Sequence, residues 1–594
     1  MRTDSLKRVF GVIGVALSIG CSTPSPPGDV ADTVYTNGKI YTVNEAQPWA
    51  EAVAVKDGKL LVVGSNADVE PVTGLSTKAV DLAGQFMMPG VFDLHAHPFI
   101  TPWYGGMNLS LQNPGDADAI LAEIRAYADA NPDKEWLIGG QYLVGVFPED
   151  NPSKELLDGI STDRAVAILD QTGHSMWINS KAMELAGITA ETETSQLIII
   201  EKDPETSEPT GTIREQGIQL VERVIPQATG EEYAGPIEEI FDMFLSYGIT
   251  ALQSAEGHRA PLEGLKLLES DGRLHQRVFV SWDWKTTLNL AYTLEDIEAQ
   301  IQNRSIYESE FIRPNYVKIF ADGSPSSFTS ALIEPYSHNP NFYGDANMTV
   351  EEFAEAFKMF DDWGVGVHVH AMGDGTIRRV IDALEMMKEA NGDSGVRHKV
   401  AHNTMITPED LSRVAAMKDV NIDFSPPLWY PHAGGKATFQ PPIGEERFAK
   451  IYPVRTALDQ VGLHVGQGAD WLTANPTPDP FIAIEGFVTR ESPFDPEMPG
   501  TLGVDQAITL EEAIAICTIE GAWVLGVEGE LGSLEVGKFA DMIVLDQNLF
   551  EIDAREIYGT QVLQTIVGGE VVYDRGKQGS EDIDVDQMVD RMID

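Results

Sequence analysis

Residues 91–97 read Val-Phe-Asp-Leu-His-Ala-His, and both the fold and the chemistry can be predicted outward from this run. Apolar residues alternate with His95 and His97, which matches the two-residue period of a β-strand. Both imidazoles are therefore expected on one face of the strand. Two neutral imidazoles at a strand end can together coordinate a borderline-soft divalent ion such as zinc. Two incidental histidines on an ordinary strand are the alternative, and the motif alone does not decide.

Length and charge limit what the chain can be. At 594 residues, of which 43% are hydrophobic, it can bury a large core and is expected to hold more than one structural unit. The formal net charge is −51, so a nucleic acid would be repelled and is excluded as a partner. The sequence does not reveal the oligomeric state, and a homodimer stays open.

Short alternating segments at both ends of the chain predict β-structure. Between residues 31 and 88, Asn37-Gly38 and Asp57-Gly58 are strong hairpin signals. Residues 501–575 contain a helical pattern and then return to alternating segments, which are too few to bury a core alone. We therefore predict one small β-sandwich built from both ends of the chain. Residues 576–594 are expected to form a C-terminal tail.

Apolar strand-like segments alternate with amphipathic helical segments over residues 89–500. The strand candidates are residues 136–140, 165–170, 249–254, 277–282, 316–320, 365–370, 399–402, 421–424 and 464–468. Strands interleaved with helices form parallel sheets, and eight or more such units predict a TIM (β/α)8 barrel of the α/β class.

Several of these strands end in groups that bind metal ions well. His370 closes a second His-x-His run, and His402 closes a later strand. Asp470 follows a late strand, and Lys318 lies among β-branched and aromatic neighbours. Catalytic groups of a TIM barrel collect at the carboxyl ends of its strands, so these side chains are expected to meet at one mouth.

Three residues near these candidate ligands could position them without binding the ion. His368 should point to the same face as His370, one layer deeper, and is expected to be structural or to orient a ligand. Asp322 and Asp374 follow two of the ligand strands. They could orient ligands, and a role in a turn is the alternative.

The order of these groups resembles the amidohydrolase superfamily of metal-dependent hydrolases. The phrases HVHAMGD, VKIFADG and GAD are similar to its amidohydrolase-3 branch, the group related to N-substituted formamide deformylases. GQFMMPGVFDLHAH and, at residues 532–546, GSLEVGKFADMIVLD also resemble superfamily signatures. The second of these belongs to the composite sandwich of that superfamily. The resemblance covers nearly the whole chain after the N-terminal segment.

The resemblance implies a centre of two divalent ions, with zinc as the expected metal. His95 and His97 would hold one ion, and His370 and His402 would hold the second. Lys318 would be carboxylated by carbon dioxide and would bridge the two, because an unmodified amine is a poor bridging ligand. An uncarboxylated lysine in an ion pair is the alternative.

The resemblance also implies the catalytic groups. Asp470 would bind the first ion and act as general base, taking a proton from a metal-activated water and passing it to the leaving nitrogen. His174 lies in a segment similar to the branch's GH…W.NS phrase and could polarise the substrate carbonyl. A plain loop histidine is the alternative for His174.

These roles predict a hydrolase of a non-peptide C–N bond, with a small N-acyl or N-formyl amide as substrate. One alternative keeps the fold but uses a single ion held by His95, His97, a later histidine and Asp470, as deaminases and some cyclic-amide or lactone hydrolases do. A second alternative is a catalytically inactive surface lipoprotein that binds a ligand. The complete set of ligand residues argues against it.

The first residues are typical of a targeting segment. Basic residues precede a short apolar run, which predicts a signal peptide over residues 1–20. Residues 21–30 resemble a lipoprotein linker that begins with a lipidated Cys21, although Ser18, three places before Cys21, departs from the usual pattern. We expect export in a bacterium to the periplasm or cell envelope, with the lipid as the contact with the membrane. A plain secretory signal is the alternative. Cys517 is the second of two cysteines, so no disulfide is expected in the exported body.

Overall fold

The computed structural model describes residues 30–99, 108–111, 116–142, 146–147, 151–170, 175–194, 198–285, 293–425, 427, 429–431, 433–471, 477–493 and 500–577. The predicted signal peptide, Cys21, His174 and nearly all of the expected C-terminal tail lie outside these residues. Among the helices in these ranges, none combines the length and the apolar character needed to cross a membrane.

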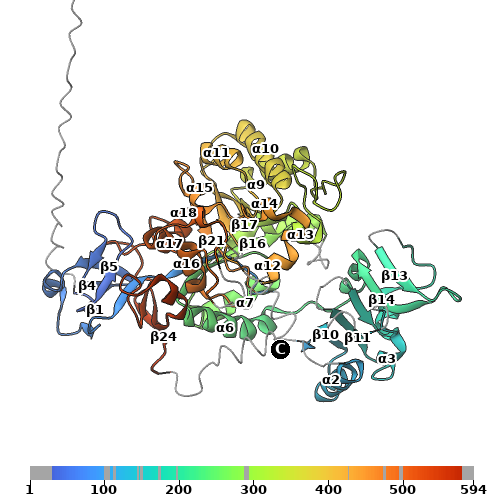
Figure 1. Ribbon diagram of the computed structural model, residues 1–594. Coiled ribbons are helices and arrows are strands. Elements are labelled where there is room, and N and C mark those ends of the chain that lie inside the picture. Colours follow the sequence, from blue (N-terminus) through green and yellow to red (C-terminus); the bar gives the residue numbers. More distant parts are fainter. Residues whose placement is uncertain are drawn as a thin grey trace, which may run out of the picture.

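Eight parallel strands form the central sheet, and each pairs with the barrel strand that follows it in the chain. This confirms the predicted α/β fold with a TIM-type barrel (Figure 1). The strands are almost entirely buried, as their apolar sequences require. In order around the barrel they are β8 (Val91–Ala96), β15 (Ile249–Ser254), β16 (Arg277–Asp283), β17 (Ile312–Phe320), β18 (Gly366–Ala371), β19 (His398–His402), β20 (Val420–Phe424) and β21 (Val465–Gln467).

The chain segments that follow β8 and β21 close the barrel. The N–H of Asp470 donates to the carbonyl of His95 at 2.7 Å, and the N–H of His97 donates to the carbonyl of Trp471 at 2.5 Å. Gly468 is needed at this point, because a Cβ there would overlap the backbone of His95. The contacts that close the barrel therefore also bring Asp470 beside the two histidines.

Helices surround the barrel, and side-chain caps fix where several of them begin. The hydroxyls of Thr229 and Thr349 accept the N–H of the glutamate three residues later, and each glutamate carboxylate accepts the threonine N–H in return. Apolar faces of these helices pack on the strands in one large core. The helices are α6 (Gly230–Ser246), α7 (Arg259–Ser270), α8 (Leu294–Gln302), α9 (Val350–Asp362), α10 (Asp374–Asn391), α11 (Pro408–Ala416), α12 (Ala433–Thr438), α13 (Gln440–Ile443), α14 (Glu445–Phe448), α15 (Val454–Leu458), α16 (Pro480–Thr489), α17 (Leu510–Ile516) and α18 (Ile519–Leu525).

A separate six-stranded sheet is inserted between β8 and β15, which corrects one expectation. Residues 136–140 and 165–170 are not barrel strands but lie in the inserted sheet. Its parallel strands and first helix repeat the local alternation of a barrel, so the sequence pattern could not distinguish them. Apolar clusters on both faces of the sheet give this unit its own core. Its elements are β9 (Leu109–Ser110), α2 (Ala117–Ala130), β10 (Trp136–Tyr142), α3 (Lys154–Asp158), β11 (Ala165–Asp170), β12 (Ser175–Ile178), α4 (Ser180–Ala186), β13 (Ile198–Lys202), β14 (Pro209–Glu215) and α5 (Gln219–Glu222).

The predicted β-sandwich is built from both ends of the chain. One sheet has the order β5-β4-β1-β6, and the other has the order β24-β23-β22-β7-β2-β3. In the second sheet the N-terminal strand β7 pairs antiparallel with the C-terminal strand β22. Figure 1 shows the N-terminal strands β1, β4 and β5 beside the C-terminal strand β24 on one flank of the barrel. The elements are β1 (Thr33–Thr36), β2 (Lys39–Tyr41), β3 (Trp49–Ala50), β4 (Ala52–Lys56), β5 (Lys59–Gly64), α1 (Asn66–Val69), β6 (Lys78–Asp81), β7 (Phe86–Pro89), β22 (Met542–Leu545), β23 (Val562–Val567) and β24 (Glu570–Asp574).

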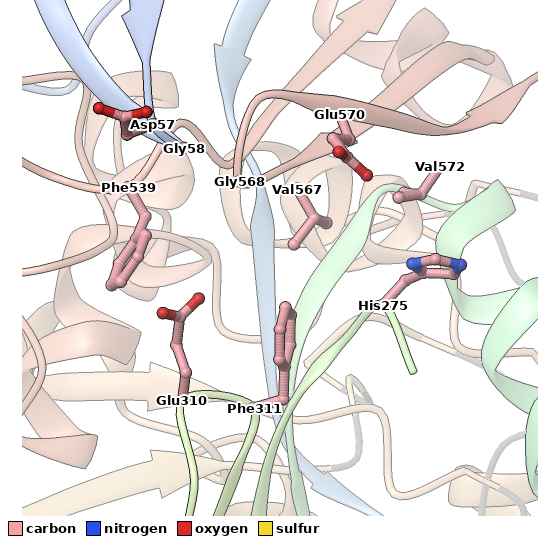
Figure 2. Close-up of a pocket in the computed structure, with 10 residues that line it drawn as sticks. All are labelled: Asp57, Gly58, His275, Glu310, Phe311, Phe539, Val567, Gly568, Glu570 and Val572. Carbon is pink, nitrogen blue, oxygen red and sulfur yellow. The ribbon is translucent and has the colours of Figure 1, made fainter. Parts of the chain in front are cut away.

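A buried ion pair joins the sandwich to the end of the barrel where the strands begin. Arg277, the first residue of β16, donates from Nε and Nη2 to the two carboxylate oxygens of Asp541 at 2.6 and 3.1 Å. A cavity of about 210 Å³ lies beside this pair and is lined by Glu310, Phe311 and Phe539 among others (Figure 2). This cavity is at the opposite end of the strands from the histidines, so it is not the site predicted from the sequence.

Candidate metal centre

The six side chains that the sequence analysis assigned to metal binding gather at the carboxyl-terminal mouth of the barrel. His95, Lys318 and His402 are each at most 2% exposed, on β8, β17 and β19. Alternation along each strand brings these side chains inward. The full set is His95, His97, Lys318, His370, His402 and Asp470.

One half of the group has the spacing of a metal site. Ligand-type atoms of His95, His97 and Asp470 all lie within 4.8 Å of one another. The His97 Nε2 atom is 3.2 Å from Asp470 Oδ1, and the His95 Nε2 atom is 3.8 Å from the same oxygen. Lys318 Nζ contacts His95 Nε2 at 2.8 Å. The ring nitrogens, the carboxylate and the amine therefore face one small volume.

His402 and His370 form the other half. Their ring centroids are 4.3 Å apart, and the His402 ring centroid is 4.5 Å from that of His95. His402 Nδ1 contacts the carbonyl of Ser425 at 2.9 Å. The Nε2 atom of His402 is buried, and among the described residues no group forms a hydrogen bond with it. A buried polar atom without a partner is costly, and a bound cation would satisfy it.

Two of the imidazoles have a carboxylate at their Nδ1 atom. His97 Nδ1 contacts Glu256, which follows β15 and also accepts the N–H of Phe99 at 2.9 Å. His370 Nδ1 contacts Asp322 Oδ1 at 3.1 Å. A carboxylate on one ring nitrogen fixes the ring and leaves the other nitrogen for a metal ion. Asp322 therefore has the orienting position that was one of its two predicted roles.

Asp374 has the role in a turn, which was the alternative prediction for it. Its carboxylate accepts the N–H groups of Ile333 and Gly375, each at 2.9 Å, at the start of α10. It thus anchors a loop and a helix start. In the described part of the chain its carboxylate forms no hydrogen bond with the histidines.

Burial shifts the pKa values of the candidate metal-binding side chains. It lowers the pKa of His95 and His402 well below the ordinary value, and it lowers the pKa of Lys318 to about 7. Burial opposes protonation of His97 too, but the Glu256 and Asp470 carboxylates outweigh it and raise its pKa to about 9. Neutral imidazoles are the form that binds metal ions.

The backbone is strained at two of the candidate ligands. His402 and Asp470 have φ values of +69° and +55°, in the left-handed region that non-glycine residues seldom adopt. Each such residue costs of the order of 1–3 kcal/mol, and such strain concentrates at functional sites. Asn403, the residue after His402, also has a positive φ, +50°. Its side-chain amide stabilises the backbone there by donating to the carbonyls of Val400 and Asp423 at 2.7 and 2.9 Å.

A second layer of buried polar residues lies directly beneath the mouth. Lys399 Nζ is 2.6 Å from Asp423 Oδ2 and donates to the carbonyl of Leu94 and to Gln253 Oε1 at 2.6 and 2.7 Å. His95, His368 and Asp423 also have the spacing of a metal site. The Lys399 ammonium already provides the cation there, so this layer needs no ion.

Several of these residues were missed by the sequence analysis. Glu256, Lys399 and Asp423 carry no local motif. Only the inward position of Lys399 and Asp423 on barrel strands, and the position of Glu256 just after β15, could have marked them. Asp283 is another: it lies opposite Lys318 in the register of β16 and β17 and is 3% exposed. Burial and the nearby Glu256 raise the pKa of Asp283 well above its usual value.

The chemistry of the donor set fits a divalent ion. Imidazoles and carboxylates suit zinc and several neighbouring metals, and the buried His402 Nε2 offers an unused donor atom. A TIM barrel with such a group at its carboxyl-terminal mouth is an arrangement that suits a metal-dependent hydrolase.

Comparison with known proteins also identifies the chain as a metal-dependent hydrolase. The model of the amidohydrolase family matches residues 78–573, and the chain belongs to that family. It is therefore a metal-dependent hydrolase of the class that acts on carbon–nitrogen bonds, as predicted.

Two relatives match almost end to end. The chain is 26% identical over 563 residues to Protein LONG AFTER FAR-RED 3 of Arabidopsis thaliana, covering 93% of each chain. It is 25% identical over 569 residues to the N-substituted formamide deformylase of Arthrobacter pascens, covering 92% of this chain and 98% of the relative. A solved structure, an uncharacterized metal-dependent hydrolase from Pyrococcus horikoshii, has the same fold, with a TM-score of 0.70 at 21% identity over 88% of this chain and 99% of that one.

Proposed function

We propose that this chain hydrolyses small N-formyl or N-acyl amides by means of two divalent ions. The observation that carries the proposal is the gathering of six ligand-type side chains at the barrel mouth, three of which have the spacing of a metal site. Within the described residues the buried Nε2 atom of His402 has no hydrogen-bond partner, which leaves it for an ion. The similarity to an N-substituted formamide deformylase over 92% of the chain supports the substrate class.

The residues divide between the two ions. His95, His97 and Asp470 would hold the first, and His370 and His402 the second. When bound, the ions lower the pKa of water and polarise the carbonyl that is attacked.

Lys318 is proposed to be carboxylated. It is fully buried, and its one hydrogen bond in the described part of the chain is with the neutral ring of His95. A bond forms between Nζ and the carbon of carbon dioxide, and Nζ loses a proton. The resulting carbamate carries two oxygens and a negative charge, which would offset the cations around it.

Asp470 is proposed to move the proton. Its carboxylate takes a proton from the attacking water and delivers it to the nitrogen of the leaving amine. Its strained backbone and its contact with His97 at 3.2 Å hold it beside the reacting groups. His174 would polarise the substrate carbonyl, as its sequence context suggests.

A substrate panel tests the function. Zinc-loaded protein is incubated with N-formyl and N-acetyl amines, lactones and adenosine analogues, and release of amine is measured. We expect amine release from the amides, and a loss of about 10²–10⁴-fold in kcat for Asp470→Asn. Asp374→Asn is the matched control, because that aspartate anchors a turn, and it should retain activity.

The other outcomes separate the alternatives. Ammonia released from the nucleosides would favour a deaminase, and lactone hydrolysis without amide hydrolysis would favour the cyclic-ester class. Tight binding of an amide without turnover would favour an inactive binding protein. Any of these results would overturn the proposed amide hydrolysis.

Metal analysis tests the number of ions. We expect about two equivalents of zinc per chain and a carbamate ¹³C signal after equilibration with labelled carbonate. One equivalent without a carbamate would support the single-ion alternative.

We propose that the protein is exported and held at the membrane by a lipid on Cys21, on the strength of residues 1–20 and the Ser/Pro-rich stretch that follows. Fractionation of expressing cells should place the protein with membranes, and Cys21→Ser should release it. Membrane attachment that survives this substitution would contradict the anchor.

A further inference from the structure

A continuous chain of hydrogen bonds crosses the barrel beneath the proposed metal centre. Lys399 Nζ donates to Gln253 Oε1 at 2.7 Å, and Gln253 Nε2 donates to Ser281 Oγ at 3.2 Å. Ser281 Oγ contacts His368 Nδ1 at 2.9 Å, and His368 Nε2 contacts His95 Nδ1 at 3.2 Å. All five side chains are fully buried, and each comes from a different barrel strand.

His95 presents its two ring nitrogens to different surroundings. Its Nε2 faces the centre, 2.8 Å from Lys318 Nζ and 3.8 Å from Asp470 Oδ1. Its Nδ1 faces His368. A ring that gives its Nε2 lone pair to an ion carries its proton on Nδ1, and that buried proton needs an acceptor.

His368 can be that acceptor in one tautomer only. Its Nε2 is free to accept when its own proton is on Nδ1, and that proton then points at Ser281 Oγ. A hydroxyl oxygen has two lone pairs, which suffices for both His368 and the Gln253 amide. The amide itself is oriented, because its oxygen faces the Lys399 ammonium.

The nearby carboxylate is a poorer acceptor. Asp423 Oδ2 is 4.0 Å from His95 Nδ1, beyond hydrogen-bond distance, and is engaged by Lys399 at 2.6 Å.

We propose that His368, backed by Ser281, is a positioning residue that fixes the tautomer and orientation of His95 so that its Nε2 lone pair points at the ion. This rests on the proposed metal-binding role of His95. It gives a role to His368, the first histidine of the second His-x-His run, which lies one layer below the mouth. An apolar residue could fill the same space, but it would leave the Nδ1 proton of His95 unsatisfied.

Two substitutions at one position separate positioning from packing. The amide of His368→Gln can reach the place of Nε2 and accept from His95. The amide of His368→Asn reaches only the place of Nδ1. We measure zinc affinity by competition with a chromogenic chelator, and the visible absorption of the cobalt-substituted protein as a report on ligand geometry.

We expect His368→Asn to weaken zinc binding by about 10–100-fold and to alter the cobalt spectrum, the usual effect of losing such a partner. His368→Gln should recover most of the affinity. Ser281→Ala, which removes the next link, should give a smaller loss in the same direction. His398→Asn is the matched control, because His398 is equally buried but bonds to Asp361 at 3.0 Å, and its zinc affinity should not change.

The outcomes are distinct. Wild-type protein that binds no zinc would defeat the proposed function itself. Wild-type protein that binds zinc, with equal affinities for the Asn and Gln variants, would overturn the positioning role and leave the function standing. If His368→Asn does not fold, unchanged zinc affinity in Ser281→Ala overturns the inference.

Discussion

Lys318 and Lys399 are both fully buried in the same barrel, on strands that differ by two positions, yet their surroundings are opposite. Lys399 has three acceptors within 2.7 Å, one of them the carboxylate of Asp423. Lys318 has a neutral imidazole at 2.8 Å. An ammonium with three acceptors is satisfied by the protein. A lone amine among imidazoles indicates a site that becomes complete only with groups from solution.

The same contrast holds between the two layers. In the lower layer the buried Lys399 has three acceptors from the protein. In the upper layer the buried Nε2 atom of His402 has no hydrogen-bond partner among the described residues, and two candidate ligands, His402 and Asp470, have strained backbone conformations. Burial is common to both layers, so it is the backbone strain and the free ring nitrogen that distinguish the upper one.

The largest expected difference between the lysines is in activity. Lys318→Met should reduce kcat by about 10³-fold or more, because the proposed bridging ligand and several kcal/mol of transition-state stabilisation would be lost. The folded state should persist, as measured by circular dichroism. Retention of more than a tenth of the wild-type rate would show that Lys318 is not part of the centre.

The next expected difference is in stability. Lys399→Met leaves the Asp423 carboxylate buried without its counter-ion and should lower the free energy of unfolding by about 3–5 kcal/mol. Urea unfolding followed by tryptophan fluorescence measures this. The double substitution Lys399→Met/Asp423→Asn removes the unpaired charge and keeps an amide oxygen that can accept the N–H of His402. It should recover part of the loss, and no recovery would mean that the buried charge is not the source of the effect.

The smallest expected change, counted per pH unit, is a pH dependence of the stability of the metal-free protein. Burial lowers the pKa of Lys318 to about 7, against 10.5 in the unfolded chain. Between these values the unfolded chain binds a proton that the folded chain lacks, so stability should rise with pH, by at most about 1.4 kcal/mol per pH unit. The chelator-treated wild type should show this rise relative to Lys318→Met. Parallel pH profiles for the two proteins would contradict it.

Much of the mouth could be predicted because its histidines come in short motifs. Alternation placed His95 and His97 on one face, and the strand-end positions of His370, His402 and Asp470 followed from the barrel rule. Glu256, Asp283 and the partners of Lys399 could not be found in this way, because a single charged residue in an apolar strand has no pattern of its own.

The barrel as a whole was predictable, but the inserted sheet was not. Strands β10 and β11 have the same local sequence pattern as barrel strands, and only pairing between distant segments distinguishes them. The composite sandwich was predictable for the opposite reason, since the strand-like segments at the C-terminal end are too few to bury a core alone.

Diffraction from crystals of the zinc-loaded protein at the zinc absorption edge tests the central claim most directly. We predict two anomalous peaks, one among His95, His97 and Asp470 and one beside His370 and His402, with extra density on Lys318 between them. A mouth without a peak, with Lys318 unmodified and directed away from these histidines, would contradict the account.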